Sequence, residues 1–265
     1  MESSRPDALF HDHFAERLAG ERGEQIARKM PWGKRLAWST VTRTVLIDEI
    51  ILRMVGRGVD TVMNLAAGLD ARPYRLALPE SLRWVEFDLP DMTATKSELL
   101  AADKPRCQLE RVAVDLRDHA ARRRALAEQA ATAKSALVLT EGLLIYLDET
   151  IVSELARDLH EQASIRYWMM DLASPVIVKQ MQKWWGKQMK AAGTWMNFGP
   201  AEGTRFFEPM GWQEVEFGEL YLTALRIDRK PPLTWLFNLQ TKLFPARSKR
   251  RMAEWRSGVA LLEQK

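Results

Sequence analysis

The sequence predicts a single α/β domain in which helices cover both faces of a mostly parallel sheet. Three observations lead to this fold class. Short apolar runs alternate with segments of helical periodicity between residues 59 and 172, a turn of small residues ends the first run, and acidic residues follow several others. Alternation at this spacing is typical of parallel βαβ units with right-handed crossovers.

Length and composition set broad limits on the class of protein. A chain of 265 residues with 46% hydrophobic and 28% charged residues can bury one substantial core. The apolar runs are too short to span a bilayer, and the N-terminus lacks the apolar stretch of a signal peptide. Cys107 is the single cysteine, which excludes an internal disulfide and suits a reducing compartment. We therefore expect a cytoplasmic protein without a membrane partner, with Cys107 in the core.

Helices are expected ahead of the first strand, in residues 1–58. Apolar residues repeat at helical spacing from Asp7 to Leu18 and predict a first helix. Thr40 to Val55 predicts a longer amphipathic helix, which Gly56 and Gly58 end.

Strands and helices then alternate through residues 59–172, the part expected to bind a cofactor. The predicted strands are Thr61–Leu65, Leu82–Asp88, Gln108–Val114, Ala136–Thr140 and Arg166–Asp171. The predicted helices lie around Met92–Ala102, Arg117–Ala131 and Glu149–His160. Because helices connect the strands, we expect the strands to run parallel.

The pattern changes in residues 173–265, which we expect to form the substrate or lid half. A Met- and Trp-rich helix is predicted over Val176–Ala192, followed by a loop at Trp195–Pro200. Trp212–Phe217 and Gly258–Glu263 read as strands that could pair. The stretch between them, 219–256, is expected to be helical with breaks at its prolines, Pro231, Pro232 and Pro245. The aromatic residues here fit either the core or a pocket wall: Trp184, Trp185, Trp195, Phe198, Phe206 and Phe207.

The turn after the first predicted strand is the strongest functional signal. Ala66, Ala67 and Gly68 let the backbone approach a ligand, and glycine tolerates a positive φ. Asp88 ends the second strand 20 residues after Gly68, where it can accept hydrogen bonds from ribose hydroxyls. Each feature alone also fits a structural role, the turn as packing and Asp88 as a helix cap. Together they predict a nucleotide-like cofactor, either a dinucleotide or S-adenosylmethionine.

Further charged residues lie at strand ends and on the second helix. Asp115 could accept from an adenine amino group while Leu116 donates a backbone N–H, or Asp115 could cap a helix. Glu141 follows a central strand, where an unpartnered buried charge is costly, and could hold an ammonium or balance a sulfonium. Arg43 lies on an otherwise apolar helix and could pair with a ligand carboxylate or form a surface salt bridge.

Other chemistries receive little support from the sequence. The four histidines, at positions 11, 13, 119 and 160, form no convincing metal set. Neither a Gly-x-Ser-x-Gly nor a Ser-x-x-Lys element, which would indicate a nucleophilic enzyme, is present. The net charge of +4 is too small to indicate nucleic-acid binding. A local basic cluster lies near the end of the sequence and consists of Arg247, Lys249, Arg250 and Arg251. It is consistent with a solvent-exposed surface or with a contact for an anionic partner such as RNA.

With these motifs in place, the chain resembles the leucine carboxyl methyltransferase family, in particular its bacterial branch of polyketide-biosynthesis O-methyltransferases. The most specific pieces are Asn-Leu-x-x-Gly-Leu-Asp-x-Arg and Glu-Gly-Leu-Leu-x-Tyr-Leu. The resemblance covers roughly residues 5–217 in the family's order. The matching segments are Arg5–Phe10, Arg43–Asp48, Met63–Leu76, Phe87–Pro90, Asp115–Arg117, Glu141–Leu147 and Phe206–Trp212.

The resemblance implies a class I methyltransferase fold, whose seven-stranded sheet is mostly parallel and ends in an antiparallel pair. It implies S-adenosylmethionine as the cofactor and a set of contacts to it. Arg43 would contact the methionine carboxylate, the Ala66–Gly68 turn would follow the methionyl part, and Glu141 would lie near the amino group. Asp88, with Leu89 beside it, would hold the ribose, and Asp115 and Leu116 the adenine.

One departure from the family pattern concerns the turn itself. The family usually has glycine where this chain has Ala66. A positive φ there would be strained, so the affinity for the cofactor is expected to be lower.

The resulting hypothesis is O-methylation of a small organic or polyketide-like acceptor at a carboxylate or a hydroxyl. A carboxylate needs no general base, whereas a hydroxyl does, and Tyr146 or a histidine could serve. Arg75 could orient an acceptor carboxylate, and Tyr146 and Trp195 could line the acceptor site. One alternative is a nicotinamide-dependent oxidoreductase, which the absence of a full Gly-x-Gly-x-x-Gly motif disfavours. A second is a methyltransferase that acts on a protein C-terminus or on modified tRNA. A third is a non-catalytic cofactor-binding protein. The motifs do not specify the oligomeric state.

Overall fold

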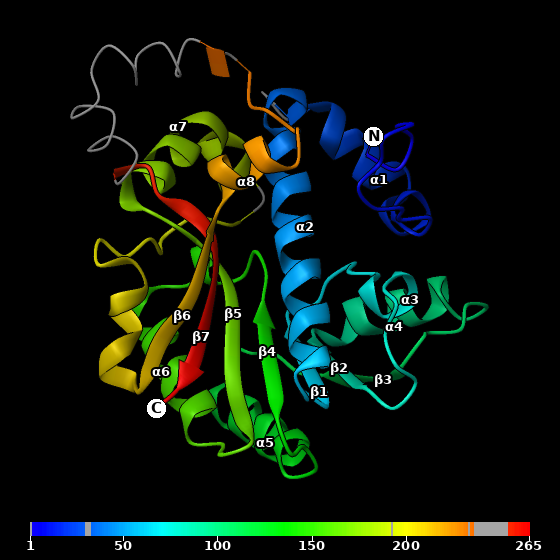
Figure 1. The fold of residues 1–265 in the computed structure, drawn as a ribbon, viewed down its shortest axis with the longest axis vertical. Coiled ribbons are helices and arrows are strands. Elements are labelled where there is room, and N and C mark those ends of the chain that lie inside the picture. Colours follow the sequence, from blue (N-terminus) through cyan, green and yellow to red (C-terminus); the bar gives the residue numbers. More distant parts are fainter. Residues whose placement is uncertain (1, 30–32, 192, 233, 236–253) are drawn as a thin grey trace.

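The computed structural model describes residues 2–29, 33–191, 193–232, 234–235 and 254–265, and it contains one seven-stranded sheet (Figure 1). The strand order is β3-β2-β1-β4-β5-β7-β6. The strands are β1 (Thr61–Leu65), β2 (Arg83–Asp88), β3 (Gln108–Ala113), β4 (Ala136–Thr140), β5 (Ile165–Ala173), β6 (Trp212–Glu219) and β7 (Ser257–Gln264). β1 to β5 run parallel, and β7 is antiparallel to both β5 and β6. The predicted sheet, including its antiparallel end, is confirmed.

Helices pack on both faces of this sheet (Figure 1). They are α1 (Ala15–Lys29), α2 (Gly33–Gly56), α3 (Arg72–Arg75), α4 (Pro90–Leu99), α5 (His119–Ala130), α6 (Glu149–His160), α7 (Pro175–Ala191) and α8 (Leu220–Arg226), with 3₁₀ helices η1 (Leu144–Tyr146) and η2 (Gly203–Met210). α2 covers one face, whereas α5 and α6 cover the other. α7 follows the carboxyl end of β5 and lies beyond that end of the sheet.

The core forms two layers because the central strands are apolar on both faces. Every residue of β1 and β4 is buried, as expected for parallel strands between helical layers. Ile47, Ile50 and Ile51 of α2 belong to the cluster on one face. Leu126 of α5 and Leu155 of α6 belong to the cluster on the other. Cys107 is buried as predicted, and burial raises the pKa of its thiol to about 11, so the thiol stays protonated.

The first predicted helix, Asp7–Leu18, is wrong over its first two thirds. Residues 7–14 are not helical, and α1 begins at Ala15. The Asp12 carboxylate accepts the backbone N–H groups of Phe14 and Ala15 at 3.0 Å, which caps the helix at this point. Arg229, far along the chain, also holds this segment through Asp7 at 3.0 Å. The apolar spacing did not reveal the cap or this long-range pair.

The carboxyl ends of β1 and β4 mark the point where the strand order reverses. β2 and β3 lie on one side of β1, and β4 and β5 on the other. In open α/β sheets, ligands bind in the crevice outside the carboxyl ends of the strands at such a switch point. The Ala66–Gly68 turn follows β1, and Glu141 follows β4. The fold therefore brings these two predicted features to the same crevice.

The last third of the chain was only partly predicted. In the stretch expected to be helical, 219–256, the described part contains α8 and then a non-helical segment over 227–232. The predicted break at Pro245 and the basic cluster at 247–251 lie outside the described residues. Within the described ranges, no helix is long and apolar enough to cross a bilayer, and His, Cys, Asp and Glu form no group of three suited to a metal ion.

Candidate active site

The turn after β1 is held by a carboxylate from the next strand. Asp88 Oδ2 accepts the backbone N–H of Gly68 at 2.6 Å, and its Oδ1 accepts that of Leu89 at 2.8 Å. Gly68 has a φ of 48°, a conformation that favours glycine. Each carboxylate oxygen can accept more than one hydrogen bond, so Asp88 retains capacity for a ligand hydroxyl.

Ala66 also has a positive φ, 54°, which confirms the conformation that the sequence identified as strained. At a positive φ, the strain from a Cβ lowers the free energy of unfolding by roughly 1–2 kcal/mol. Glycine avoids this strain but lowers the free energy of unfolding by about 0.5–1 kcal/mol, because its unfolded chain has more conformational freedom. We expect Ala66→Gly to raise the free energy of unfolding by about 0.5–1 kcal/mol, measured by denaturant titration. The control is Ala67→Gly, since Ala67 is buried in the same turn without a positive φ, and it should be destabilising. A less stable Ala66→Gly protein would contradict the strain.

A cavity of about 310 Å³ lies over this turn, and we call it the turn cavity. Its wall combines Ala66 and Gly68 with charged side chains from other elements. Arg43 comes from α2, Arg72 from α3, and Glu141 from the end of β4. Four of the predicted cofactor residues, Arg43, Ala66, Gly68 and Glu141, thus line one cavity.

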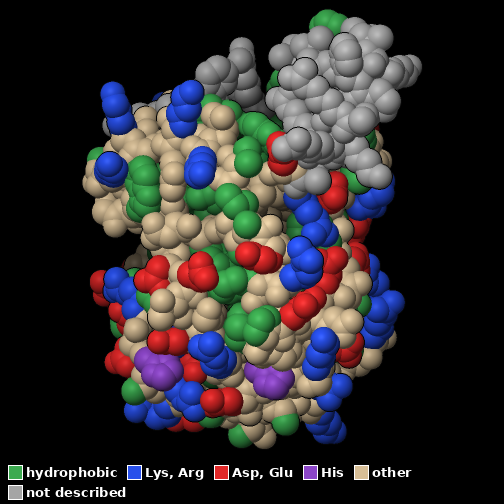
Figure 2. Space-filling model, turned by 90° about the vertical axis from the view of Figure 1, so that its left-hand side faces the viewer, with side chains coloured by type: hydrophobic (Ala, Val, Ile, Leu, Met, Phe, Trp, Pro, Cys, Tyr) green, Lys and Arg blue, Asp and Glu red, His purple; other side chains and the backbone are tan. Residues whose placement is uncertain are grey.

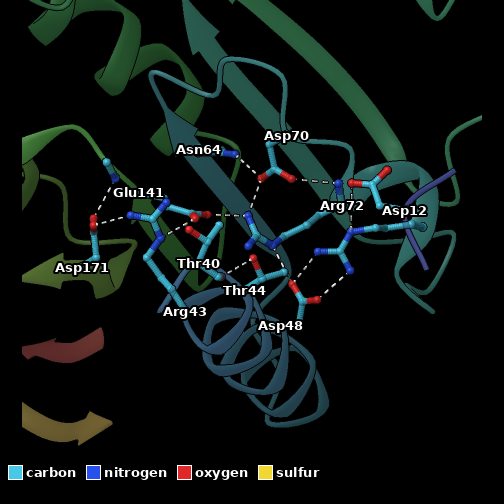
Figure 3. Close-up of polar contacts among 12 residues, drawn as sticks. Asp12, Thr40, Arg43, Thr44, Asp48, Asn64, Asp70, Arg72, Glu141 and Asp171 are labelled. Atoms are coloured by element: carbon cyan, nitrogen blue, oxygen red, sulfur yellow. Dashed lines mark hydrogen bonds and ion pairs between the residues drawn. The ribbon is translucent and has the colours of Figure 1, made fainter. Parts of the chain in front are cut away.

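A chain of ion pairs crosses the wall of the turn cavity (Figure 3). Arg43 lies between two carboxylates, with Nε 2.9 Å from Glu141 Oε1 and Nη1 2.9 Å from Asp171 Oδ2. On its other side, Glu141 Oε2 accepts from Arg72 Nη1 at 2.7 Å. The Arg43 side chain is therefore already paired with protein carboxylates, and these ion pairs are more buried than a simple surface salt bridge. It forms a partly buried pair with two acidic strand ends.

Arg72 is the most buried link of this chain. Its side chain is 4% exposed and contacts Asp70 at 2.9 Å and Asp48 at 2.6 Å in addition to Glu141. Burial opposes the charge, but the carboxylates of Asp70, Glu141 and Asp48 outweigh it and raise the pKa of Arg72 well above its usual value. Arg72 therefore joins the ends of β1 and β4 to α2 as a permanent cation.

The chain of ion pairs carries a net negative charge. Three arginines, Arg43, Arg72 and Arg75, face five carboxylates, which leaves two negative charges when all are ionised; the carboxylates are those of Asp12, Asp48, Asp70, Glu141 and Asp171. The charged residues that line the turn cavity balance, with three arginines against Asp12, Asp70 and Glu141, and the excess negative charge comes from Asp48 and Asp171 outside that lining. A net negative surrounding favours a ligand that carries positive charge.

Arg75 lies in the turn cavity and is not free to move. Its side chain is 7% exposed, pairs with Asp48 at 2.6 Å and stacks over the Phe10 ring at 5.2 Å. It therefore stands beside the predicted cofactor residues, not beside Tyr146 and Trp195, with which the sequence analysis grouped it.

The residues expected near an adenine follow β3 on the surface. Asp115 pairs with Arg117 at 2.7 Å, and this hydrogen-bonded pair lowers the pKa of the Asp115 carboxyl. The alternative that Asp115 caps a helix is wrong, because Asp118 accepts from Ala121 N–H at the start of α5. The other four predicted cofactor residues lie outside the lining of the turn cavity: Asp88, Leu89, Asp115 and Leu116.

Tyr146 and Trp195 line a separate open depression of about 480 Å³ together with Lys190 and Asn197. Partial burial and the nearby Asp171 carboxylate raise the pKa of the Tyr146 phenol. A phenol of raised pKa stays protonated at neutral pH, so Tyr146 is poorly suited to the role of a general base.

A cavity of about 430 Å³ opens on the other side of Arg43, and we call it the aromatic chamber. Trp38 of α2, Met181, Trp184 and Trp185 of α7, and Tyr221 of α8 line it. Of the aromatic residues left open between core and pocket wall, Trp184 and Trp185 line the chamber, whereas Phe198 and Phe207 are buried in the core. Arg43 lines both the turn cavity and the aromatic chamber, and Asp171 lines the chamber.

Several residues of this site were missed by the sequence analysis. Asp171 ends the fifth predicted strand, Arg166–Asp171, a signal similar to the one that identified Asp88 and Glu141, although β5 itself continues to Ala173. Asp48, Asp70 and Arg72 lie inside the matched family segments, but no local pattern shows that they meet.

The comparisons with known proteins concern the family and the fold of the chain. The sequence model described as leucine carboxyl methyltransferase matches residues 1–160. A Streptomyces coelicolor protein that carries the name of an S-adenosyl-L-methionine-dependent methyltransferase is 32% identical over 228 residues, which is 80% of this chain and 78% of that protein.

Solved structures are similar in fold at low sequence identity. A DUF574 family protein from Streptomyces avermitilis superposes with a TM-score of 0.59 at 17% identity, over 92% of this chain and 90% of its own. Magnesium protoporphyrin IX methyltransferase from Synechocystis, with bound S-adenosylhomocysteine, superposes with a TM-score of 0.51 at 12% identity. The superposition covers 95% of this chain and 99% of that protein. The chain belongs to the leucine carboxyl methyltransferase family, which confirms the class I fold and the dependence on S-adenosylmethionine that the sequence predicted.

Proposed function

We propose that the protein transfers the methyl group of S-adenosylmethionine to an oxygen of a small, largely apolar acid. One observation carries this proposal. Arg43 forms part of the wall of both the turn cavity and the aromatic chamber, so a cofactor in the first and an acceptor in the second would meet at this residue.

The charge of the turn cavity suits this cofactor. S-adenosylmethionine carries a sulfonium, an ammonium and a carboxylate, hence one net positive charge, whereas the chain of ion pairs around the turn cavity carries two net negative charges. Glu141 would take the ammonium and Arg43 the carboxylate, so ligand groups would replace part of the present ion pair between them. Asp88 would hold the ribose, with Leu89, Asp115 and Leu116 toward the adenine.

The transfer requires alignment more than proton movement. An oxygen lone pair of the acceptor attacks the methyl carbon in line with sulfur, the carbon–sulfur bond breaks, and its electron pair stays on sulfur as a neutral thioether. A carboxylate acceptor is already the nucleophile, so no base is needed. The contribution of the protein is to position the two reactants and exclude water.

The size and lining of the aromatic chamber support a small acceptor. Its volume of about 430 Å³ falls within the range of roughly 300–1,000 Å³ that small-molecule sites occupy. Its tryptophans and Met181 suit an aromatic or polyketide-like body, while Arg43 and Asp171 mark the polar end. Neither alternative acceptor, a protein C-terminus or modified tRNA, accounts for the apolar lining of this chamber.

Calorimetric titration tests the cofactor site directly. We expect the protein to bind S-adenosylmethionine and S-adenosylhomocysteine and not NAD. Asp88→Asn keeps the shape of the side chain but removes its charge, and it should weaken cofactor binding about 10- to 100-fold, since a charge-assisted hydrogen bond contributes about 1.5–3 kcal/mol.

Asp60→Asn is the control, because Asp60 also accepts backbone N–H groups but lies before β1, at the opposite end of that strand. It should bind the cofactor normally. Normal binding by a folded Asp88→Asn protein would contradict the role of Asp88. Methyl transfer is then tested with aromatic and polyketide-like acids, and a folded, cofactor-bound protein that methylates none of them would contradict the acceptor class.

A further inference from the structure

The outer face of α7 carries a stripe of lysines, which we call the α7 lysine stripe. Lys179, Lys183, Lys187 and Lys190 occur at helical spacing and therefore lie on one side of the helix. All four are exposed, and the helix contains no acidic residue. Lys190 lies 4.9 Å from the Trp195 ring, and no ion pair joins any of the four to another described residue.

This arrangement is unfavourable for the isolated helix. Like charges at i and i+4 destabilise a helix, and no described carboxylate offsets them. Figure 2 looks onto the side of the molecule that carries α7. It shows separate Lys and Arg side chains with hydrophobic side chains between them on the upper part, whereas Asp and Glu are mixed with Lys and Arg lower down. The stripe thus lies on a face where an anionic partner would find little repulsion.

The opposite side of α7 faces the aromatic chamber. Val178 and Met189 are buried, while Met181 and Trp185 line the chamber. Exposed apolar side chains occur at three further points, each next in sequence to a residue of the chamber wall: Val176, Leu222 and Trp235, of which Trp235 is 67% exposed. α7 is therefore a basic amphipathic helix beside a chamber whose surroundings expose apolar groups.

Contrary to the expectation from the sequence that the protein has no membrane partner, we infer that the α7 lysine stripe docks it on an anionic lipid surface. Lysine side chains spread over about 16 Å of helix match a diffuse, flat layer of charge and require no shape complementarity. A basic amphipathic helix is typical of interfacial anchors, because its lysines keep their charged ends in water while their stems cover apolar surface. An acidic protein would instead require complementary pockets on this face.

Docking would place α7 between the lipid surface and the aromatic chamber, so that about one helix diameter, ~10 Å, separates the two. Apolar acids partition into the lipid phase, so the acceptor could enter from the membrane surface. This last step rests on the proposed function, whereas the docking itself does not.

Co-sedimentation with vesicles tests the inference on the full chain. We expect binding to phosphatidylserine-containing phosphatidylcholine vesicles, no binding to phosphatidylcholine alone, and release at high salt. The double variant Lys183→Gln and Lys187→Gln should lower the partition coefficient about 30-fold, at about 1 kcal/mol per lysine. The matched control is Lys104→Gln with Lys134→Gln, which removes the same charge before β3 and β4, at the opposite end of the sheet. It should bind vesicles within twofold of the unmodified protein.

Three results would overturn the inference. These are no binding to anionic vesicles, equal loss in the stripe and control variants, and a stripe-dependent binding to polyglutamate without binding to vesicles, which would indicate an acidic protein partner. Circular dichroism establishes that the variants are folded. Calorimetry with S-adenosylmethionine separates this inference from the proposed function, because the stripe variant should bind the cofactor normally whether or not it docks.

Discussion

Replacing Arg72 by methionine is expected to lower the free energy of unfolding by about 3–5 kcal/mol. The side chain is 4% exposed and contacts Asp48, Asp70 and Glu141. Methionine fills similar space but leaves three carboxylates without their common cation, and an uncompensated buried charge is the costly outcome of breaking such a pair. Denaturant titration measures the loss. A change below about 1 kcal/mol would show that the ion pairs do not hold this part of the fold together.

The same variant should also lose its response to the cofactor. Binding to the native state raises the melting temperature, so S-adenosylmethionine should stabilise the unmodified protein but hardly stabilise Arg72→Met. Asp158→Ala is the control. Asp158 pairs with Arg122 at 2.6 Å, both 2% exposed, between α5 and α6 and away from the turn cavity. It should be comparably destabilised and still respond fully to the cofactor. An equal response in both variants would make the role of Arg72 purely structural.

Glu141→Gln is expected to weaken the binding of S-adenosylmethionine about 10- to 100-fold. The substitution keeps the shape of the side chain but removes the charge proposed to hold the ammonium, and a hydrogen bond to a charged group contributes about 1.5–3 kcal/mol. Because Glu141 also pairs with Arg43 and Arg72, the variant should be less stable as well. Calorimetry well below its melting temperature separates the two effects. Normal affinity in the folded variant would place the ammonium elsewhere.

Asp171→Asn is the matched variant on the other side of Arg43. Asp171 contacts Arg43 at 2.9 Å, as Glu141 does, but it lines the aromatic chamber and not the turn cavity. We expect it to raise KM for the acceptor while changing the affinity for S-adenosylmethionine little. If both variants altered only the cofactor affinity, the division of the site into two cavities would be wrong.

Much of the fold could be predicted because its signals are local. The strands Thr61–Leu65 and Ala136–Thr140 were predicted to the residue, since strands buried on both faces read as continuous apolar runs. The helix Glu149–His160 was also predicted to the residue, and Asp148 caps it by accepting from Ile151 N–H. The helix placed at Asp7–Leu18 failed because the cap at Asp12 and the contact with Arg229 do not appear in apolar spacing.

The sequence alone determined the class of fold, the family, and the positions of Ala66, Gly68, Asp88 and Glu141, because strand ends and tight turns depend on neighbouring residues. Only the tertiary structure decided what these residues contact. It joined Arg43 of α2 to Glu141 and Asp171, buried Arg72 among three carboxylates, and enclosed the aromatic chamber between α2, α7 and α8. Such contacts join residues far apart in the chain, and their strength depends on burial and on the geometry of the charged partners, neither of which is encoded in any short segment.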